Sequence, residues 1–299
     1  MKIDIDEKPV VSVIVPVKNV EHLLEALLSA LRAQNYPKDK TQIIIVDNGS
    51  LDRTESILTQ HPEILFAREN HVPGSYAARN KGLSLAVGDV IAFTDADCRP
   101  KPDWIMRGVE ALVREGAALA GGRVVFTVSD RPTTSELIDA SVFMQNEYNI
   151  KDRRTAVTAN LFVRRDVFHS IGLFEEVRSG GDYLWTKKAT SNGFSLIYAP
   201  EAIVHHPARR FRALMEKSYR VGSGFVSLLP RRFYALRVLK LVLRLLTPIP
   251  SKVIFKLARE HRHNSRIKKG YFSFWSIAYA YQLVEAAAVI RSIFKKPRS

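Results

Sequence analysis

The sequence predicts an α/β fold in which a mixed sheet is flanked by helices, followed by a basic helical tail. β-branched apolar runs alternate with stretches whose apolar residues recur at helical spacing, which is typical of βαβ units. Polar or acidic residues follow several of these runs directly. Most of the excess positive charge lies near the C-terminus.

The first hundred residues show the clearest alternation. Val10–Val17 is an almost unbroken β-branched run, as expected for a strand buried on both faces of a parallel sheet. From Val20 to Leu31 the apolar residues follow the i, i+3, i+4, i+7 spacing of an amphipathic helix. The same order then repeats, with strands expected at 42–46, 64–67 and 90–94 and helices at 52–60 and 74–86.

The second half of the chain has a mixed pattern. Strands are expected at 119–128, 156–163 and 195–198, with helical stretches between them. The last stretch of the chain is helical and basic in character, and no internal repeat or low-complexity linker interrupts the pattern. One catalytic domain with a C-terminal appendage is the expected organisation for 299 residues.

Composition and the N-terminus indicate a cytoplasmic protein. Hydrophobic residues make up 46% of the chain, which is enough for a sizeable core. The single cysteine, Cys98, has no partner for an internal disulfide. Met1–Pro9 has neither the basic nor the apolar region of a secretory signal.

The charge distribution predicts a polyanionic partner for the tail. Residues 205–299 hold 21 Lys and Arg against three Asp and Glu, a net charge of +18, whereas residues 1–204 hold 24 and 27. Such an asymmetry indicates contact with a nucleic acid or with an anionic membrane leaflet.

The tail sequence favours the membrane. In Ala235–Leu246 the cations Arg237, Lys240 and Arg244 share one helical face, and almost every other position is apolar. This pattern is typical of a helix lying in a membrane interface, although a helix packed on the catalytic domain is the alternative. Gly270–Phe294 is long enough to span a bilayer, but a buried Glu285 is costly there, so an interfacial or packed helix is favoured.

Asp95-Ala96-Asp97 is the sharpest chemical feature of the sequence. It follows an apolar strand, and ligands bind at the carboxyl ends of strands in open α/β sheets. Two carboxylates at this position need cations or several hydrogen bonds, and Mg²⁺ takes carboxylate and phosphate oxygens. A pair of solvated loop aspartates is the alternative for an isolated motif of this kind.

Six stretches, which occur in the family's order along the chain, resemble the family 2 glycosyltransferases. These enzymes have the GT-A fold, a Rossmann-like sheet that binds nucleotide sugars. The resemblance extends from about residue 9 to 226. It implies an inverting transferase of the polysaccharide or cell-envelope biosynthesis type. The matching stretches are Val11–Asn19, Ile43–Thr54, Ala78–Pro100, Ala159–Arg165, Ser179–Trp185 and Ala199–Pro207.

The resemblance implies a nucleotide pocket at the first two strand ends. Asp47 matches the acidic residue that contacts the base or ribose, and the turn Pro16, Val17 to Asn19 matches the other wall of this pocket. Many relatives have two adjacent acids where this chain has Asp47-Asn48.

The resemblance also implies a metal and diphosphate site. Asp95-Ala96-Asp97 matches the DxD motif, in which Asp95 and Asp97 hold Mg²⁺ or Mn²⁺ on the diphosphate of the nucleotide-sugar donor. His206 matches a histidine that lies near the metal, and Arg79 is expected to neutralise phosphate charge, although a solvated helix position is the alternative for it.

Asp182 matches the catalytic base of the family. A carboxylate there would take the proton of the acceptor hydroxyl as that hydroxyl attacks the anomeric carbon. Relatives often have Glu-Asp where this chain has Gly181-Asp182, so a single acid must act as the base. A helix N-cap is the alternative role for Asp182.

The sequence therefore predicts a GT-A catalytic domain at 1–226 and a basic amphipathic membrane-association region at 227–299. The expected acceptor is a glycan or lipid-linked molecule at the inner face of the cell membrane. A nucleic-acid-binding function is disfavoured because aliphatic rather than aromatic residues alternate with the cations. A sugar-phosphate nucleotidyltransferase is disfavoured because the turn after the first strand lacks glycine.

Overall fold

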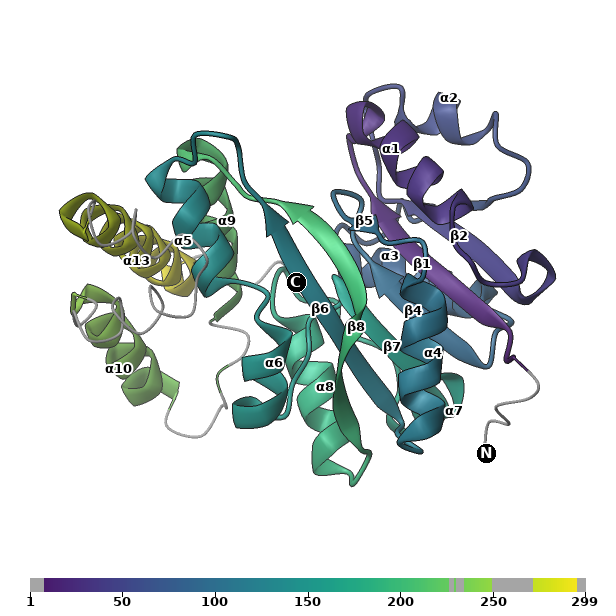
Figure 1. Cartoon of the computed structure of the whole chain (residues 1–299). Coiled ribbons are helices and arrows are strands. Elements are labelled where there is room, and N and C mark those ends of the chain that lie inside the picture. Colours follow the sequence, from purple (N-terminus) through teal and green to yellow (C-terminus); the bar gives the residue numbers. More distant parts are fainter. Residues whose placement is uncertain (1–7, 226–228, 230–233, 249–270, 295–299) are drawn as a thin grey trace. The chain divides into compact units, whose positions relative to one another are not determined.

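The computed structural model describes residues 8–225, 229, 234–248 and 271–294 (Figure 1). Most of the predicted N-terminal segment Met1–Pro9 and parts of the predicted tail lie outside these residues. The chain divides into two compact units. Unit 1 comprises Met1–Val125, Met144–Glu176 and Gly181–His206, and unit 2 comprises Phe126–Phe143, Val177–Gly180 and Pro207–Ser299.

One eight-stranded sheet, in the order β3-β2-β1-β4-β7-β6-β8-β5, forms the framework of unit 1 (Figure 1). β1 pairs in parallel with β2 and β4, and β2 with β3, whereas β7 is antiparallel to β4 and β6. The sheet is therefore mixed, as the sequence predicts. The strands are β1 Val11–Val17, β2 Thr41–Asp47, β3 Leu65–Arg68, β4 Val90–Thr94, β5 Arg99–Pro100, β6 Leu119–Thr127, β7 Asn160–Arg164 and β8 Leu196–Pro207.

Helices connect these strands in the order expected for βαβ units. The central strands are buried on both faces because they consist of β-branched and apolar residues, and Val13, Ile14 and Val15 have no exposed surface. The helices of unit 1 are α1 Glu21–Arg32, α2 Thr54–Leu58, α3 Ser75–Leu85, α4 Trp104–Arg114, α6 Asn146–Tyr148, α7 Arg165–Ile171 and α8 Gly181–Ser191, with the 3₁₀ turn η1 Lys38–Lys40 and the π-helical turn η2 Asn149–Arg153.

The first four strands and three helices confirm the predicted alternation, with boundaries that differ by a few residues. The largest difference is in β8, which was predicted at 195–198 and extends over Leu196–Pro207. Its second half, from Glu201 onward, alternates exposed and buried positions rather than forming an apolar run. Alternation of this kind is typical of a strand with one solvent-facing side.

Unit 2 contains α5 Thr134–Val142, α9 Phe211–Phe225, α10 Tyr234–Leu246 and α13 Tyr271–Phe294. α13 packs against α9, α5 and α10. A Cβ added at Gly222 of α9 would lie 2.5 Å from the Glu285 carbonyl oxygen, so the two helices pack closely there. Among the described helices, α13 alone is long and apolar enough to cross a membrane by length and composition.

Two buried acidic residues of unit 2, Asp139 and Glu285, avoid an uncompensated charge in different ways. Asp139 has no exposed surface and pairs with Lys217 at 2.9 Å and with Arg209 at 3.3 Å. Burial raises the pKa of Glu285 to about 8, which keeps most of this carboxyl neutral at pH 7 and removes the cost of burying its charge. The packing of α13 therefore does not require Glu285 to face lipid.

Candidate active site

Several of the predicted site residues, among them Asn19, Asp47 and Asp95, lie at or just after the carboxyl ends of the parallel strands β1, β2 and β4. β1 and β2 are in register from Val11 opposite Thr41 to Val17 opposite Asp47, and β4 lies on the other side of β1. Because parallel strands end at the same edge, the segments that follow β1, β2 and β4 emerge there together. This edge is the usual ligand-binding position of an open α/β sheet.

The segments after β1 and β2 are joined through Ser50. Asp47 is buried, and its carboxylate accepts the Ser50 hydroxyl and, at 3.1 Å, the Ser50 backbone N–H. The same hydroxyl oxygen accepts the Asn19 N–H at 2.8 Å, and the Asn19 Oδ1 accepts the Leu51 N–H at 2.7 Å. Asn19 has φ 52°, a left-handed conformation that these bonds help to hold.

The two other residues of the predicted nucleotide wall, Pro16 and Val17, belong to β1. Val17 is buried, and its carbonyl accepts the Asn48 N–H at 2.9 Å, whereas Pro16 is partly buried. Val17 thus bonds the segment after β2 through its backbone, and Asn19 does so through its side chain; a nucleotide pocket at this place remains a prediction.

Asn48 explains the departure from the paired acids of the family. Its side chain is buried and donates from Nδ2 to the carbonyls of Glu69 and Val72, both at 2.9 Å, while its Oδ1 accepts the Gly74 N–H. An aspartate lacks the two donors that these carbonyls need. Asn48 thus holds the loop before α3, which leaves Asp47 as the acid of this pair.

Replacing Asn48 with aspartate should lower the free energy of unfolding by about 2 to 4 kcal/mol, because two buried carbonyls lose their donors and face a carboxylate. Urea denaturation measures this difference. Asn70→Asp, an exposed position in the same loop, is the matched control and should change stability little. Equal stability of Asn48→Asp and wild type would contradict the loop-holding role.

Arg79 and Asp95 form the best-buried ion pair of the site. Arg79 Nη2 lies 2.5 Å from Asp95 Oδ1, and the Arg79 side chain is 3% exposed. Its guanidinium also lies over the ring of Tyr76, 5.3 Å from the centroid, since the two residues are three apart on α3. The charge of Arg79 is therefore partly compensated by Asp95, and its predicted contact with phosphate remains a prediction.

Asp97 and His206 are in direct contact. Asp97 Oδ2 lies 3.1 Å from His206 Nε2, and the imidazole is fully buried. The antiparallel pairing of β5 with β8, which places Arg99 opposite His205, brings the segment after the aspartates beside the histidines. Of the two adjacent histidines, His206 is thus the one that reaches the predicted metal ligands.

The side chains of Asp95, Asp97 and His206 fit a hard divalent cation in type. Carboxylate oxygens and an imidazole nitrogen suit Mn²⁺ and Mg²⁺, which usually complete their coordination with substrate phosphates and water. No group of three or more His, Cys, Asp or Glu side chains in the described part of the chain is gathered closely enough to hold a metal by itself. A cation here would therefore need oxygens from a bound diphosphate.

The residues between and after the two aspartates pack into the protein. Ala96 is 9% exposed and Cys98 is fully buried. Burial, with the nearby carboxylates of Asp95 and Asp97, raises the pKa of the Cys98 thiol. A buried, protonated thiol is unreactive, which agrees with the absence of an assigned role for this cysteine.

Asp182 lies in the first turn of α8 and accepts three hydrogen bonds. Its Oδ1 accepts the Tyr76 hydroxyl and the Tyr183 N–H, both at 2.9 Å, and its Oδ2 accepts the Thr158 N–H at 3.3 Å. An N-cap side chain instead bonds the N–H two or three residues onward. The observed contacts hold the carboxylate in place, and its more weakly bonded oxygen is Oδ2.

Tyr76 links these predicted residues, and neither it nor Thr158, which donates to Asp182, is indicated as a site residue by the sequence. Tyr76 contacts both Asp182 and Arg79, and Arg79 contacts Asp95, so a continuous chain of contacts joins the predicted base to the DxD motif. The helical spacing of Tyr76 and Arg79 was visible in the sequence, but the contact with α8 was not.

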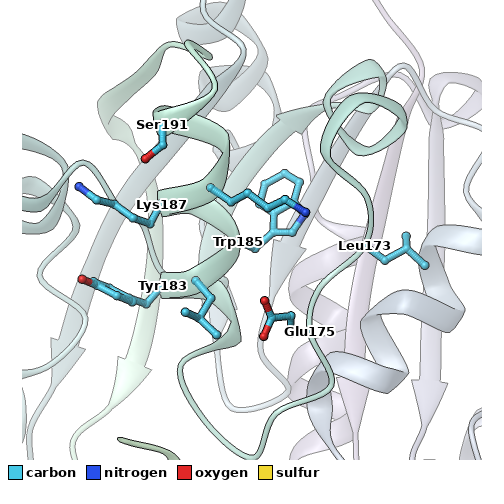
Figure 2. Close-up of a pocket in the computed structure, with 8 residues that line it drawn as sticks. Leu173, Glu175, Tyr183, Trp185, Lys187 and Ser191 are labelled. Carbon is cyan, nitrogen blue, oxygen red and sulfur yellow. The ribbon is translucent and has the colours of Figure 1, made fainter. Parts of the chain in front are cut away.

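A surface pocket lies beside α8 and contains none of the predicted site residues (Figure 2). Leu173 and Glu175 line one side, and α8 residues such as Tyr183 and Lys187 line the other (Figure 2). Tyr183 is shared by the two places, since it lines the pocket and its backbone N–H donates to Asp182.

Comparison with known sequences shows similarity along nearly the whole chain. The chain is 38% identical over 297 residues to Glycosyltransferase AglE of Haloferax volcanii, which covers 96% of this chain and 97% of that protein. It is 26% identical over 211 residues to the probable glycosyltransferase YdaM of Bacillus subtilis, covering 66% of this chain and 50% of YdaM.

Solved structures show the same GT-A fold. The mannosyltransferase PcManGT from Pyrobaculum calidifontis, in complex with GDP-Man and Mn²⁺, matches with a TM-score of 0.64 and 19% identity over 97% of this chain and 89% of that chain. TarS 1–349 of S. aureus, in complex with UDP-GlcNAc, matches with a TM-score of 0.54 and 16% identity over 95% and 93%. Residues 12–172 match the family described as Glycosyl transferase family 2. The chain is a glycosyltransferase and belongs to glycosyl transferase family 2.

Proposed function

We propose that this enzyme transfers a hexose from a nucleotide-diphosphate sugar to a polysaccharide or lipid-linked acceptor, with metal dependence and with inversion at the anomeric carbon. The observation that carries the proposal is the chain of contacts from Asp182 through Tyr76 and Arg79 to Asp95. These contacts connect the candidate base to the candidate diphosphate site. The GDP-Man and UDP-GlcNAc bound by PcManGT and TarS support the donor class.

The donor would bind with its nucleoside near Asp47 and Asn19 and its diphosphate near Asp95 and Asp97. Asp95, Asp97 and His206 would hold Mg²⁺ or Mn²⁺, and the Mn²⁺ in the PcManGT complex supports a cation of this kind. A bound divalent cation neutralises the charge that develops on the leaving diphosphate. The Arg79 guanidinium, anchored by Asp95, adds positive charge at the same place.

Asp182 would act as the general base through Oδ2. Oδ1 already accepts two hydrogen bonds at 2.9 Å, whereas Oδ2 accepts one at 3.3 Å and so retains more capacity for the proton of an acceptor hydroxyl. Attack by that hydroxyl on the face opposite the leaving diphosphate forms the new glycosidic bond and inverts the anomeric centre.

The test is release of nucleoside diphosphate from a panel of nucleotide sugars, with Mn²⁺, Mg²⁺ or EDTA. We expect turnover of one donor that requires the cation, and an inverted product by NMR. A retained anomeric configuration would contradict the role of Asp182, and turnover unaffected by EDTA would contradict the metal.

For the C-terminal part we propose attachment to the inner face of the cell membrane, with residues 1–226 as the catalytic domain and 227–299 as the membrane-association region. α10 has three distinct faces. Val238 and Leu245 are buried and pack with Ala286 and Val289 of α13. A second face is a row of leucines that are 43% to 55% exposed, namely Leu236, Leu239, Leu243 and Leu246.

The third face of α10 carries Arg237, Lys240 and Arg244, all exposed and next to the leucine row. An exposed apolar row beside a row of cations suits a helix at the surface of an anionic bilayer, where leucines enter the acyl boundary and cations meet headgroups. The opposite face packs against α13 within unit 2, so the leucine row and the cation row are the faces that would meet a bilayer. An enzyme held there would meet a lipid-linked acceptor directly.

Changing Arg237, Lys240 and Arg244 together to glutamine should weaken binding to phosphatidylglycerol-containing vesicles by about a hundredfold, since each cation contributes roughly 1 kcal/mol at such a surface. Co-sedimentation at low and high salt measures the change. The matched control removes three exposed cations from unit 1, at Arg114, Lys151 and Lys187. Equal loss in both triple variants would indicate a net-charge effect and contradict a specific role for α10.

A further inference from the structure

We infer that Tyr76 is a positioning residue for the base, and that Gly181 is a glycine because the Tyr76 ring occupies the space beside it. This inference rests on the proposed role of Asp182 and goes further, since it assigns roles to two residues to which the family resemblance gives none. The hydroxyl of Tyr76 donates to Asp182 Oδ1 at 2.9 Å. The two residues belong to α3 and α8 and are 106 apart in sequence, so tertiary packing alone creates the contact.

The ring of Tyr76 is held on three sides. The Arg79 guanidinium lies 5.3 Å from its centroid, and the Phe174 ring lies 5.8 Å away. On the third side, a Cβ added at Gly181 would lie 2.9 Å from Cγ, Cδ2 and Cε2 of the ring. No real Cβ approaches a carbon this closely, so any larger residue at 181 must displace a buried ring. The glutamate that relatives often have here therefore has no room.

The hydroxyl of Tyr76 is suited to act as a permanent hydrogen-bond donor. The residue is 7% exposed, and burial, with the adjacent Asp182 charge, raises the pKa of its hydroxyl well above the usual range. A hydroxyl that keeps its proton donates to the carboxylate throughout the working pH range. Together with the Tyr183 N–H it occupies Oδ1 and directs Oδ2 toward other partners.

A hydrogen bond to the ionised carboxylate also favours that form over the protonated one. Loss of this donor removes that preference. On acidification, the variant should therefore lose activity at a higher pH than wild type does. Displacement of the ring by a side chain at 181 should have the same consequence, because it breaks the same bond.

The test compares Tyr76→Phe, Gly181→Ala and the double variant. Each single variant should lower kcat by about tenfold to a hundredfold, with the KM for the donor nearly unchanged. The acidic limb of the pH profile of kcat should move to higher pH. In the double variant the losses should not add, because both changes act through one hydrogen bond.

Tyr148→Phe, which removes a hydroxyl from a half-exposed tyrosine of unit 1, is the control and should match wild type. An unchanged pH profile in Tyr76→Phe would overturn the inference even if Asp182→Asn is inactive. Additive losses in the double variant would overturn the link between Gly181 and Tyr76. If instead Asp182→Asn retains full activity, the proposed base itself is wrong, so the two failures are distinguishable.

Discussion

Asp182→Asn should lower kcat by about 10³- to 10⁴-fold while the dissociation constant for the nucleoside diphosphate stays within a few-fold of wild type. Asparagine preserves the shape of the side chain, and its one oxygen can still accept the Tyr76 hydroxyl and the Tyr183 N–H at the Oδ1 position, whereas the weaker bond from the Thr158 N–H is lost. It cannot take a proton from an acceptor hydroxyl. The chemical step is lost, and the donor site remains.

Steady-state turnover and calorimetric titration with the nucleoside diphosphate measure the two quantities separately. Asp152→Asn, the same change at an exposed carboxylate of unit 1, should leave both unchanged. Thermal denaturation of Asp182→Asn should show no large loss of stability, which separates a catalytic effect from unfolding. Parallel loss of binding and turnover would point to a structural or donor-binding role for Asp182 instead.

The fold of unit 1 was largely predictable because the strands and helices of its first half have hydrophobic patterns that are recognisable over short stretches of sequence. Buried parallel strands such as β1 are continuous apolar runs, and α1 has the spacing of an amphipathic helix, so both appear in any short window of sequence. β5, which has two residues, and the outer half of β8 carry no such pattern. Their pairing with each other depends on neighbours far away in the chain.

The residues of the candidate site could be named from the sequence to the extent that they lie in family motifs. Their mutual contacts could not be predicted, because packing decides them. Asn48 donates to two carbonyls of a loop more than twenty residues away, and Tyr76 reaches Asp182 across 106 residues. Both departures from the family pattern have physical reasons that only the folded chain shows. Asn48 donates to two carbonyls. Gly181 has no side chain because the Tyr76 ring fills the space beside it.

The two aspartates of the DxD motif differ in what else depends on them. Asp95 compensates the buried charge of Arg79, which is 3% exposed. Removing Asp95 would leave that cation unpaired, at a cost of about 3 to 5 kcal/mol. Asp97 contacts His206, and an imidazole, unlike a guanidinium, can also be satisfied by a neutral hydrogen-bond partner. Asp97 is therefore the position at which metal binding can be tested with the least damage to the fold.

Asp97→Ala should lower turnover by about a thousandfold or more and abolish the stimulation by Mn²⁺, because Asp97 is one of the two carboxylates proposed to hold the cation and its loss would cost several kcal/mol of charge stabilisation. Turnover titrated with Mn²⁺ and calorimetric binding of nucleoside diphosphate with and without Mn²⁺ measure the effect. Binding without the metal should match wild type, whereas the tighter metal-dependent binding should disappear.

Two comparisons make this result interpretable. Asp130→Ala, at an exposed position, should behave as wild type, and Asp95→Ala should lose both metal response and thermal stability, since it alone uncovers Arg79. If Asp97→Ala kept its response to Mn²⁺, the cation would be held elsewhere, and the contact between Asp97 and His206 would be structural. If Asp95→Ala were as stable as Asp97→Ala, the ion pair between Arg79 and Asp95 would contribute little to stability. The charge of Arg79 would then be compensated by other groups.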